Sequence, residues 1–181
     1  MASWSHFACR ARVPLGFVFA ALYLWLAQPS WKSMILGLVL IIPGLLIRAS
    51  ASGHVQKNEQ LTTTGPYAYT RNPLYLGSLV LALGFAIAAR NWWIGAALLA
   101  MLLGIYVPVI RAEEASLRTR FPEFNQYARQ VPQLLPRLTP FRHHSQSFSS
   151  ELYWKHREYN AALGALAVLA ALAAKLLWFP R

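Results

Sequence analysis

The chain has 181 residues, of which 56% are hydrophobic and only 13% charged, whereas soluble domains carry about 25% charged residues. Its apolar residues gather into five charge-free runs, which as membrane-spanning helices would use about 100 residues. This composition excludes a soluble enzyme, and the single cysteine, Cys9, excludes a disulfide-stapled scaffold.

The net charge of +11 comes from 17 Lys and Arg against six Glu, with no Asp. If the N-terminus is cytoplasmic, 13 of these 17 basic residues fall on the cytoplasmic side, as the positive-inside rule requires. Nucleic-acid-binding proteins instead gather their basic residues on one soluble face or helix. We therefore expect a multi-pass protein of a prokaryotic cell membrane, in contact with lipids and not with nucleic acid.

Five membrane spans are predicted, and the first is interpreted as a retained helix because no cleavage site follows it. The third begins at Asn72-Pro73, which fits an N-cap followed by proline at the first helical position. The alanine-rich last span carries Lys175 a turn from its outer end, where the side chain can snorkel, and its small residues suit close packing. The predicted spans cover residues 14–27, 31–48, 73–89, 92–111 and 159–179.

Beyond the fourth span, Leu117, Phe121 and Phe124 recur at helical spacing, which predicts an amphipathic cytoplasmic helix over residues 112–127. Prolines then end regular structure, and a polar linker leads to the last span. The expected fold is an all-α polytopic membrane helix bundle with about five transmembrane helices and a cytoplasmic helix after the fourth. We divide it into a two-span pair (1–50), a core (51–140) and a linker with the last helix (141–181).

Spans three and four are joined by two residues and match in length to within a turn, so they should form an antiparallel hairpin. The segments 61–75 and 111–117 would then be neighbours at one membrane face, although nearly forty residues separate them. Ionisable groups at this depth mark either a working site or simple helix anchors. In the second case Arg111 and Glu114 would be only a pair on the helix surface.

The polar groups of these two segments suit a ligand with charges of both signs. The first turn of span three offers free N–H groups to an anion. Glu113 and Glu114 suit a cation, and so do the aromatic faces of Tyr67 and Tyr75. S-adenosylmethionine, with its carboxylate, ammonium and sulfonium, fits this description beside a lipidic partner.

The same residues carry a family signature. Residues 61–67 and 71–77 resemble the L-x-T-x-G-P-Y and R-H/N-P-x-Y-x-G segments of the isoprenylcysteine carboxyl methyltransferases and the related phospholipid methyltransferases. The pattern E-E-x-x-L, with its following Phe, Tyr and Val-Pro, is similar to residues 113–132. The resemblance covers about residues 50 to 138.

This resemblance implies an integral membrane methyltransferase that uses S-adenosylmethionine and modifies a lipidic or prenylated acceptor on the cytoplasmic side. Glu114 is the candidate base for an amine or hydroxyl acceptor, and Arg111 is the arginine nearest to the place where relatives grip a carboxylate. The residues implied in cofactor binding are Leu61, Thr62, Tyr67, Arg71, Asn72, Pro73, Leu74, Tyr75, Glu113 and Glu114.

Three departures from the family pattern leave the acceptor open. Asn72 stands where many relatives have His, Pro122 replaces a glycine, and Val109 replaces the carboxylate-gripping arginine. The alternatives are an NADPH-dependent membrane reductase of the sterol-reductase type and a non-catalytic membrane protein that retains the pocket. The acceptor, the choice between O- and N-methylation, and the oligomeric state stay open.

No metal is expected. His143 and His144 with His156 have a spacing that fits no compact metal site, so we interpret them as solvated residues.

Overall fold

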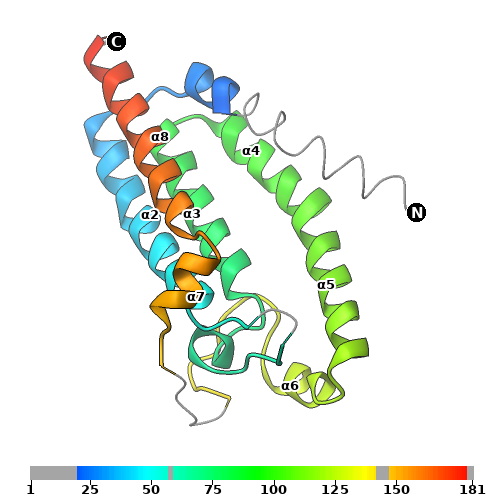
Figure 1. Cartoon of the computed structure of the whole chain (residues 1–181). Helices are drawn as coiled ribbons and strands as arrows, with labels where there is room; N and C mark the ends of the chain where they lie inside the picture. Colours follow the sequence, from blue (N-terminus) through cyan, green and yellow to red (C-terminus); the bar gives the residue numbers. More distant parts are fainter. Residues whose placement is uncertain (1–19, 57–58, 142–146, 179–181) are drawn as a thin grey trace.

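The structure is a computed structural model that describes residues 20–56, 59–141 and 147–178. Within these ranges the chain is helical and contains no β-strand, which confirms the predicted all-helical membrane bundle (Figure 1). After a first helical stretch at residues 20–26, the elements are α2 (Trp31–Ser52), η1 (Gly65–Ala68), α3 (Pro73–Ala89), α4 (Trp92–Met101), η2 (Leu102–Tyr106), α5 (Val107–Arg120), α6 (Phe124–Gln130), α7 (Ser150–Lys155) and α8 (Tyr159–Trp178).

Three helices are long and apolar enough to cross a membrane, namely Trp31–Ser52, Trp92–Arg120 and Tyr159–Trp178. Helix α3 is shorter, with 17 residues, which gives about 25 Å and lies at the lower limit for a span. Both of its ends agree with the sequence-based prediction. The start of the first predicted span and the predicted cytoplasmic N-terminus lie outside the described residues, so the number of five spans stays a prediction.

Helices α2 and α3 pack against each other more closely than any other pair, because glycines face each other at two levels. A Cβ on Gly37 would lie 2.7 Å from the carbonyl oxygen of Gly84, and a Cβ on Gly77 would lie 2.9 Å from that of Gly44. The two glycines on each helix are seven residues apart, so both contacts lie on one helix face. This backbone contact fixes α3, and with it the motif residues at the start of α3.

The fourth helix differs from its prediction. It continues from α4 through the π-helical turn η2 into α5 and ends at Arg120, so no separate helix begins at residue 112. Good helix formers follow Arg111, whereas Phe121 precedes Pro122, which disfavours the helical conformation. Figure 1 shows this helix leading away from α3 as it returns to the end of the bundle where α6 lies.

Helix α8 lies beside α2 and is fastened near its C-terminal end. Its Leu172 is fully buried, and Lys175 Nζ donates to the carbonyl oxygens of Leu24, Trp25 and Ala27 at 2.6, 2.9 and 2.7 Å. Its ammonium thus caps the end of the first helix, and the predicted snorkelling of Lys175 to the membrane surface stays a prediction. Of the small residues that suit close packing in this helix, Ala165 is buried, whereas a Cβ on Gly164 would meet no described atom within 4 Å.

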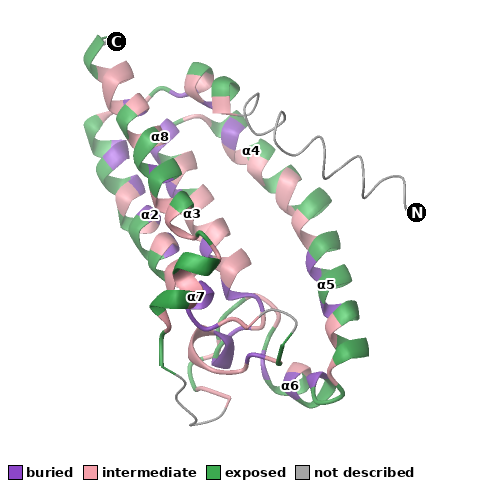
Figure 2. Ribbon diagram, in the orientation of Figure 1, coloured by how far each residue is buried: buried purple, intermediate pink, exposed green. Residues whose placement is uncertain are grey.

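Exposed side chains cover the outer faces of the helices, while buried residues concentrate where helices meet and in the loops at the motif end (Figure 2). On α2, the exposed large apolar side chains recur at helical spacing, as expected for a face turned to lipid. These residues are Ile35, Leu36, Val39, Ile42 and Leu46.

Candidate active site

An ion pair joins the two halves of the sequence motif. Arg71, just before α3, donates from Nε to Glu114 Oε1 at 2.9 Å and from Nη2 to Glu114 Oε2 at 3.1 Å. Both side chains are buried, with 12% and 9% of their surfaces exposed. The predicted meeting of segments 61–75 and 111–117 at one end of the bundle is thus confirmed.

Asn72 adds a third donor to the same carboxylate. It occupies the N-cap position of α3 with Pro73 after it, as predicted, but its side chain makes no capping bond. Its Nδ2 instead donates to Glu114 Oε1 at 3.1 Å and to the Gln133 carbonyl at 3.0 Å. The amide therefore acts as a bridge between α3, α5 and the segment after α6.

The segment after α6 packs against residues 61–72, the loop before α3 that carries the first half of the motif and is called the motif loop below. The Arg71 guanidinium donates to the carbonyl oxygens of Ala128 and Val131 at 2.6 and 3.1 Å, and the Arg71 backbone N–H donates to that of Pro132 at 3.0 Å. The Thr70 hydroxyl donates to carbonyls of the same segment. Four of the five N–H donors of Arg71 thus have acceptors, counting its bonds to Glu114, so its position is fixed.

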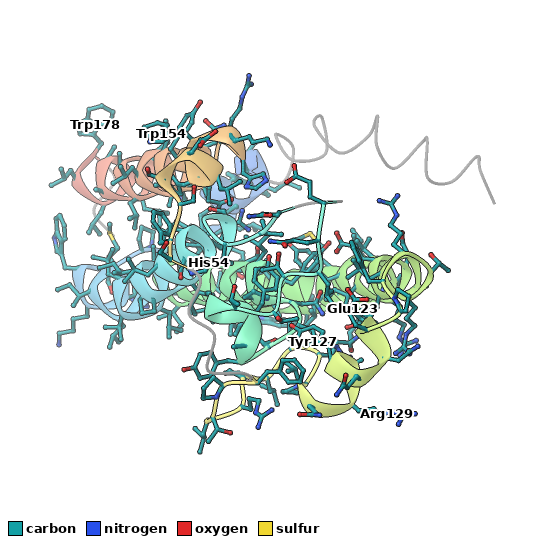
Figure 3. All side chains as sticks on the ribbon, turned by 60° about the horizontal axis from the view of Figure 1, so that its bottom comes forward. His54, Glu123, Tyr127, Arg129, Trp154 and Trp178 are labelled. Atoms are coloured by element: carbon teal, nitrogen blue, oxygen red, sulfur yellow. The ribbon has the colours of Figure 1, made fainter. Side chains whose placement is uncertain are left out.

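An apolar cluster formed by α6 and its neighbouring residues packs against this loop. It contains the buried Phe124, Tyr127 and Val131, and Leu117 and Phe121 pack against it. The Tyr127 hydroxyl donates to the Tyr67 carbonyl at 2.6 Å, and burial raises the pKa of that hydroxyl above its ordinary value, as does Glu114, while Arg71 lowers it. In the view from this end, Tyr127 lies inward and Arg129 points away from the bundle (Figure 3).

Tyr67 is the motif residue with the most unusual surroundings. Its side chain is nine-tenths buried, and burial raises the pKa of its hydroxyl, followed by effects of Tyr127, Glu113, Glu158 and Tyr75 in the same direction. Each fully enclosed polar side-chain atom in the described residues has a hydrogen-bond partner. The Tyr67 hydroxyl has none among these residues, so it is not fully enclosed by them.

The remaining predicted site residues take different positions. Thr62 accepts a hydrogen bond from the Gln56 backbone at 3.2 Å, and Tyr75 packs edge-on against Tyr106 with ring centres 5.6 Å apart. Arg111 and Glu113 are exposed, and Glu114 pairs with Arg71 and not with Arg111. Leu61 joins the apolar cluster, Pro73 is buried and Leu74 is half-buried.

A second, partly buried ion pair at this end was not predicted from the sequence. Arg48 on α2 contacts Glu158, which lies just before α8, and also donates to the Ser78 hydroxyl on α3. The signal was present, because Arg48 ends one predicted span and Glu158 precedes another, at the same membrane face. Opposite charges at equal depth in a membrane tend to pair.

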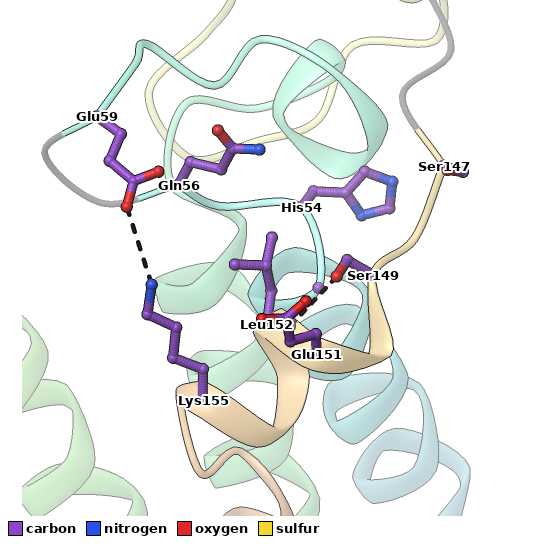
Figure 4. Close-up of a pocket in the computed structure, with 9 residues that line it drawn as sticks. His54, Gln56, Glu59, Ser147, Ser149, Glu151, Leu152 and Lys155 are labelled. Atoms are coloured by element: carbon purple, nitrogen blue, oxygen red, sulfur yellow. Dashed lines mark hydrogen bonds and ion pairs between the residues drawn. The ribbon is translucent and has the colours of Figure 1, made fainter.

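Two hollows lie beside the motif loop. A polar cavity of about 270 Å³ separates the segment after α2 from α7, with Lys155 Nζ and Glu59 Oε1 3.8 Å apart across it (Figure 4). It is lined by Gly53, His54, Gln56, Glu59, Ser147, Ser149, Glu151, Leu152 and Lys155. A shallow apolar groove of about 470 Å³ is lined by Leu46, Ile47, Ser50, Gly65, Pro66 and Tyr69, which include the Gly-Pro turn of the motif.

Among the described residues, no group of three His, Cys, Asp or Glu could hold a metal ion. His156 Nδ1 lies 3.0 Å from the Ser52 carbonyl oxygen, and His143 and His144 lie outside the described residues.

The chain is similar to a protein family and to bacterial proteins of known name. A family model described as phospholipid methyltransferase matches residues 32–123, about half of the chain. A nickel-cobalt-cadmium resistance protein of Alcaligenes xylosoxydans xylosoxydans is 39% identical over 90 residues, covering 50% of this chain and 42% of that protein. A cobalt-zinc-cadmium resistance protein of Cupriavidus metallidurans is 32% identical over 140 residues, covering 72% of this chain and 64% of that protein. No solved structure matches the chain.

Proposed function

The chain belongs to the phospholipid methyltransferase family, and on this premise we propose that it is a membrane methyltransferase that takes its methyl group from S-adenosylmethionine. The supporting observation is the network in which Arg71 and Asn72 both bind Glu114. This network ties the start of α3 to α5 at one end of the bundle, where the two motif halves together can surround a ligand.

The residues present fit that cofactor. Tyr67 has a buried ring with a hydroxyl that has no partner among the described residues, and Glu113 supplies an exposed carboxylate on α5. Aromatic faces and carboxylates suit a cation such as a sulfonium. When bound, the cofactor would supply a methyl group on positively charged sulfur, and its transfer depends chiefly on alignment with the acceptor and exclusion of water.

We propose that Glu114 organises the site. Its two oxygens already accept hydrogen bonds from three N–H groups. This arrangement favours a role of Glu114 in positioning Arg71 and Asn72 and not in proton transfer. Proton removal from an amine or hydroxyl acceptor would fall to Glu113, which is exposed one position earlier on the same helix. Arg111, also exposed on α5, is then available to an anionic group of the acceptor or of the lipid surface.

The acceptor is proposed to be lipidic or prenylated, because the site lies at the end of helices whose outer faces are apolar. The assay uses the purified full chain with methyl-labelled S-adenosylmethionine and total membrane lipids, followed by extraction of the labelled product. Glu113→Gln should lose most of the turnover. Glu123→Gln makes the same change at an exposed position beyond the end of α5, two residues after Phe121, and should keep it. Binding of NADPH without binding of S-adenosylhomocysteine would overturn the proposal in favour of a reductase.

One relative is named for resistance to nickel, cobalt and cadmium, and the other for resistance to cobalt, zinc and cadmium. Because the chain carries the methyltransferase motif, we propose that any contribution it makes to metal resistance comes from methylation of a membrane component. Growth on cobalt or cadmium would be compared between cells with the wild-type chain and with Glu113→Gln. Equal resistance, with methylation lost in the variant, would separate the two activities.

A further inference from the structure

The apolar groove at the motif end of α2 brings a membrane helix and the motif loop to one space. Three of its lining residues come from the last two turns of α2, and three come from the motif loop. The first group is Leu46, Ile47 and Ser50, and the second is Gly65, Pro66 and Tyr69. The groove has a volume of about 470 Å³.

The apolar groove continues the lipid-facing side of α2. Leu46 lines the groove and is also the last residue in the stripe of exposed apolar side chains that begins at Ile35. Its exposed fraction of 64% equals that of Val39, which lies seven residues earlier on the same helix face. A hydrocarbon chain of the bilayer that lies along this stripe therefore reaches the groove without leaving an apolar surface.

The residues along the groove change from apolar to polar. Leu46 and Ile47 are aliphatic, whereas Ser50 lies one turn beyond Leu46, about 6 Å further along the helix axis. Tyr69, which is 39% exposed, adds an aromatic ring with a hydroxyl, a combination typical of the membrane–water interface. The groove therefore lies where the hydrocarbon chain of a lipid meets its headgroup.

The short helix η1 has one side on the groove and another in the protein interior. Gly65 and Pro66 line the groove, whereas the next two residues, Tyr67 and Ala68, are buried. Gly65 has a φ of 56°, and a Cβ there would lie 2.5 Å from the ring of His54, so this turn requires glycine. A chain in the groove therefore rests on the turn that carries Tyr67.

We propose that the apolar groove holds the hydrocarbon chain of the acceptor lipid and aligns the acceptor with the candidate site. This inference rests on the proposed function. The bilayer is the source of the chain, because the groove is continuous with the lipid-facing side of α2. Lipid chains are as apolar as leucine, so the groove gains little by taking a chain out of the bilayer. Its contribution is alignment, since a chain held against η1 leaves the headgroup beside the motif loop.

Photolabelling of the full chain locates the bound chain directly. The protein is placed in vesicles of phosphatidylethanolamine and phosphatidylglycerol that contain a phospholipid with a photoreactive diazirine in its acyl chain. After illumination, mass spectrometry of the digested protein should find label at Leu46 and in the peptide with Pro66 and Tyr69. Leu46→Trp narrows the groove and should lower the label in that peptide several-fold. Val39→Trp, with equal exposure on the same helix face, should leave it unchanged.

Methylation of total membrane lipids tests the role of the groove in the reaction. Leu46→Trp should lower the rate roughly tenfold, because a displaced acceptor loses its alignment with the donor. The dissociation constant of S-adenosylhomocysteine should stay unchanged in this variant, and Val39→Trp should keep both values. Ser50→Trp narrows the groove from its polar end and repeats the comparison if Leu46→Trp does not fold.

The results separate this inference from the proposed function. Motif-loop label that persists in Leu46→Trp, or methylation by this variant at the wild-type rate, would overturn the inference. Cross-links between two copies of the chain in place of lipid label would overturn it as well. Failure of the wild-type chain to bind S-adenosylhomocysteine would instead refute the proposed function, and the photolabelling would still show whether the groove holds a lipid chain.

Discussion

The buried pair between Arg71 and Glu114 makes Glu114→Gln the most informative single change. The substitution removes the negative charge but leaves Arg71, whose side chain is 12% exposed, as a cation without its partner. Removing one member of a buried pair costs about 3–5 kcal/mol. The new amide oxygen can still accept one bond, while its NH₂ group faces an Arg71 donor, so we expect a cost of about 3 kcal/mol.

Thermal unfolding of the purified full chain measures this cost. For a chain of this size, 1 kcal/mol corresponds to roughly 2–4 °C, so the melting temperature should fall by about 6–12 °C. Glu123→Gln changes an exposed residue that makes no ion pair with the described residues, and it should shift stability by less than about 0.5 kcal/mol.

A double variant separates stability from function at the same position. Arg71→Met/Glu114→Met replaces the pair with apolar side chains and should regain most of the lost stability. It should still fail to bind S-adenosylhomocysteine, because Asn72 loses the carboxylate that orients its amide. Wild-type melting of Glu114→Gln would refute the reasoning about the buried pair, and normal methylation by the double variant would refute the role of the network.

Three further predictions concern stability. Gly37→Leu should prevent α2 from packing on α3, since a Cβ at this position would lie 2.7 Å from a backbone oxygen of α3. Gly164→Ala should be neutral or stabilising, because a Cβ there meets no described atom within 4 Å and alanine is the better helix former. Rates of proteolysis of the two variants test both expectations. Lys175→Met should lower the melting temperature, because three carbonyls of the first helix lose a charged donor, while the exposed Lys32→Met should not. Burial raises the pKa of Tyr127 above its ordinary value of 10.0, so folding favours the protonated hydroxyl. Its stabilising effect is present below pH 10 and is lost as the pH rises further. Unfolding midpoints measured across this range should therefore fall with pH, and a midpoint that rises with pH would contradict the prediction.

Much of the architecture could be predicted from local patterns. Hydropathy located α3 and α8 to within a residue at each end, because membrane helices are defined by composition and length. The two-residue connection after α3 predicted that Arg71 and Glu114 would lie at the same end of the bundle, as they do. The end of the fourth helix was misplaced at Arg111, since a change from apolar to charged residues marks the membrane boundary and not the end of a helix.

Side-chain partners could not be predicted in the same way. The sequence offered Arg111 as a neighbour of Glu114 at helical spacing, yet the carboxylate binds Arg71 and Asn72, more than forty residues away. Which of two arginines reaches a glutamate depends on how α5 is rotated about its own axis relative to α3. That rotation is set by packing and by the fold of the segment after α6, neither of which leaves a periodic signal.

By itself, the sequence determined that this protein consists of membrane helices and carries a methyltransferase motif in two separated halves. Hydrophobic periodicity and motif spacing are local properties of the chain, and they survive whatever the helices pack against. Only the tertiary structure decided that Arg48 meets Glu158, that Lys175 caps the first helix and that glycines bring α2 onto α3. These contacts join residues from different helices, so they depend on helix rotation and distance, which no single segment specifies.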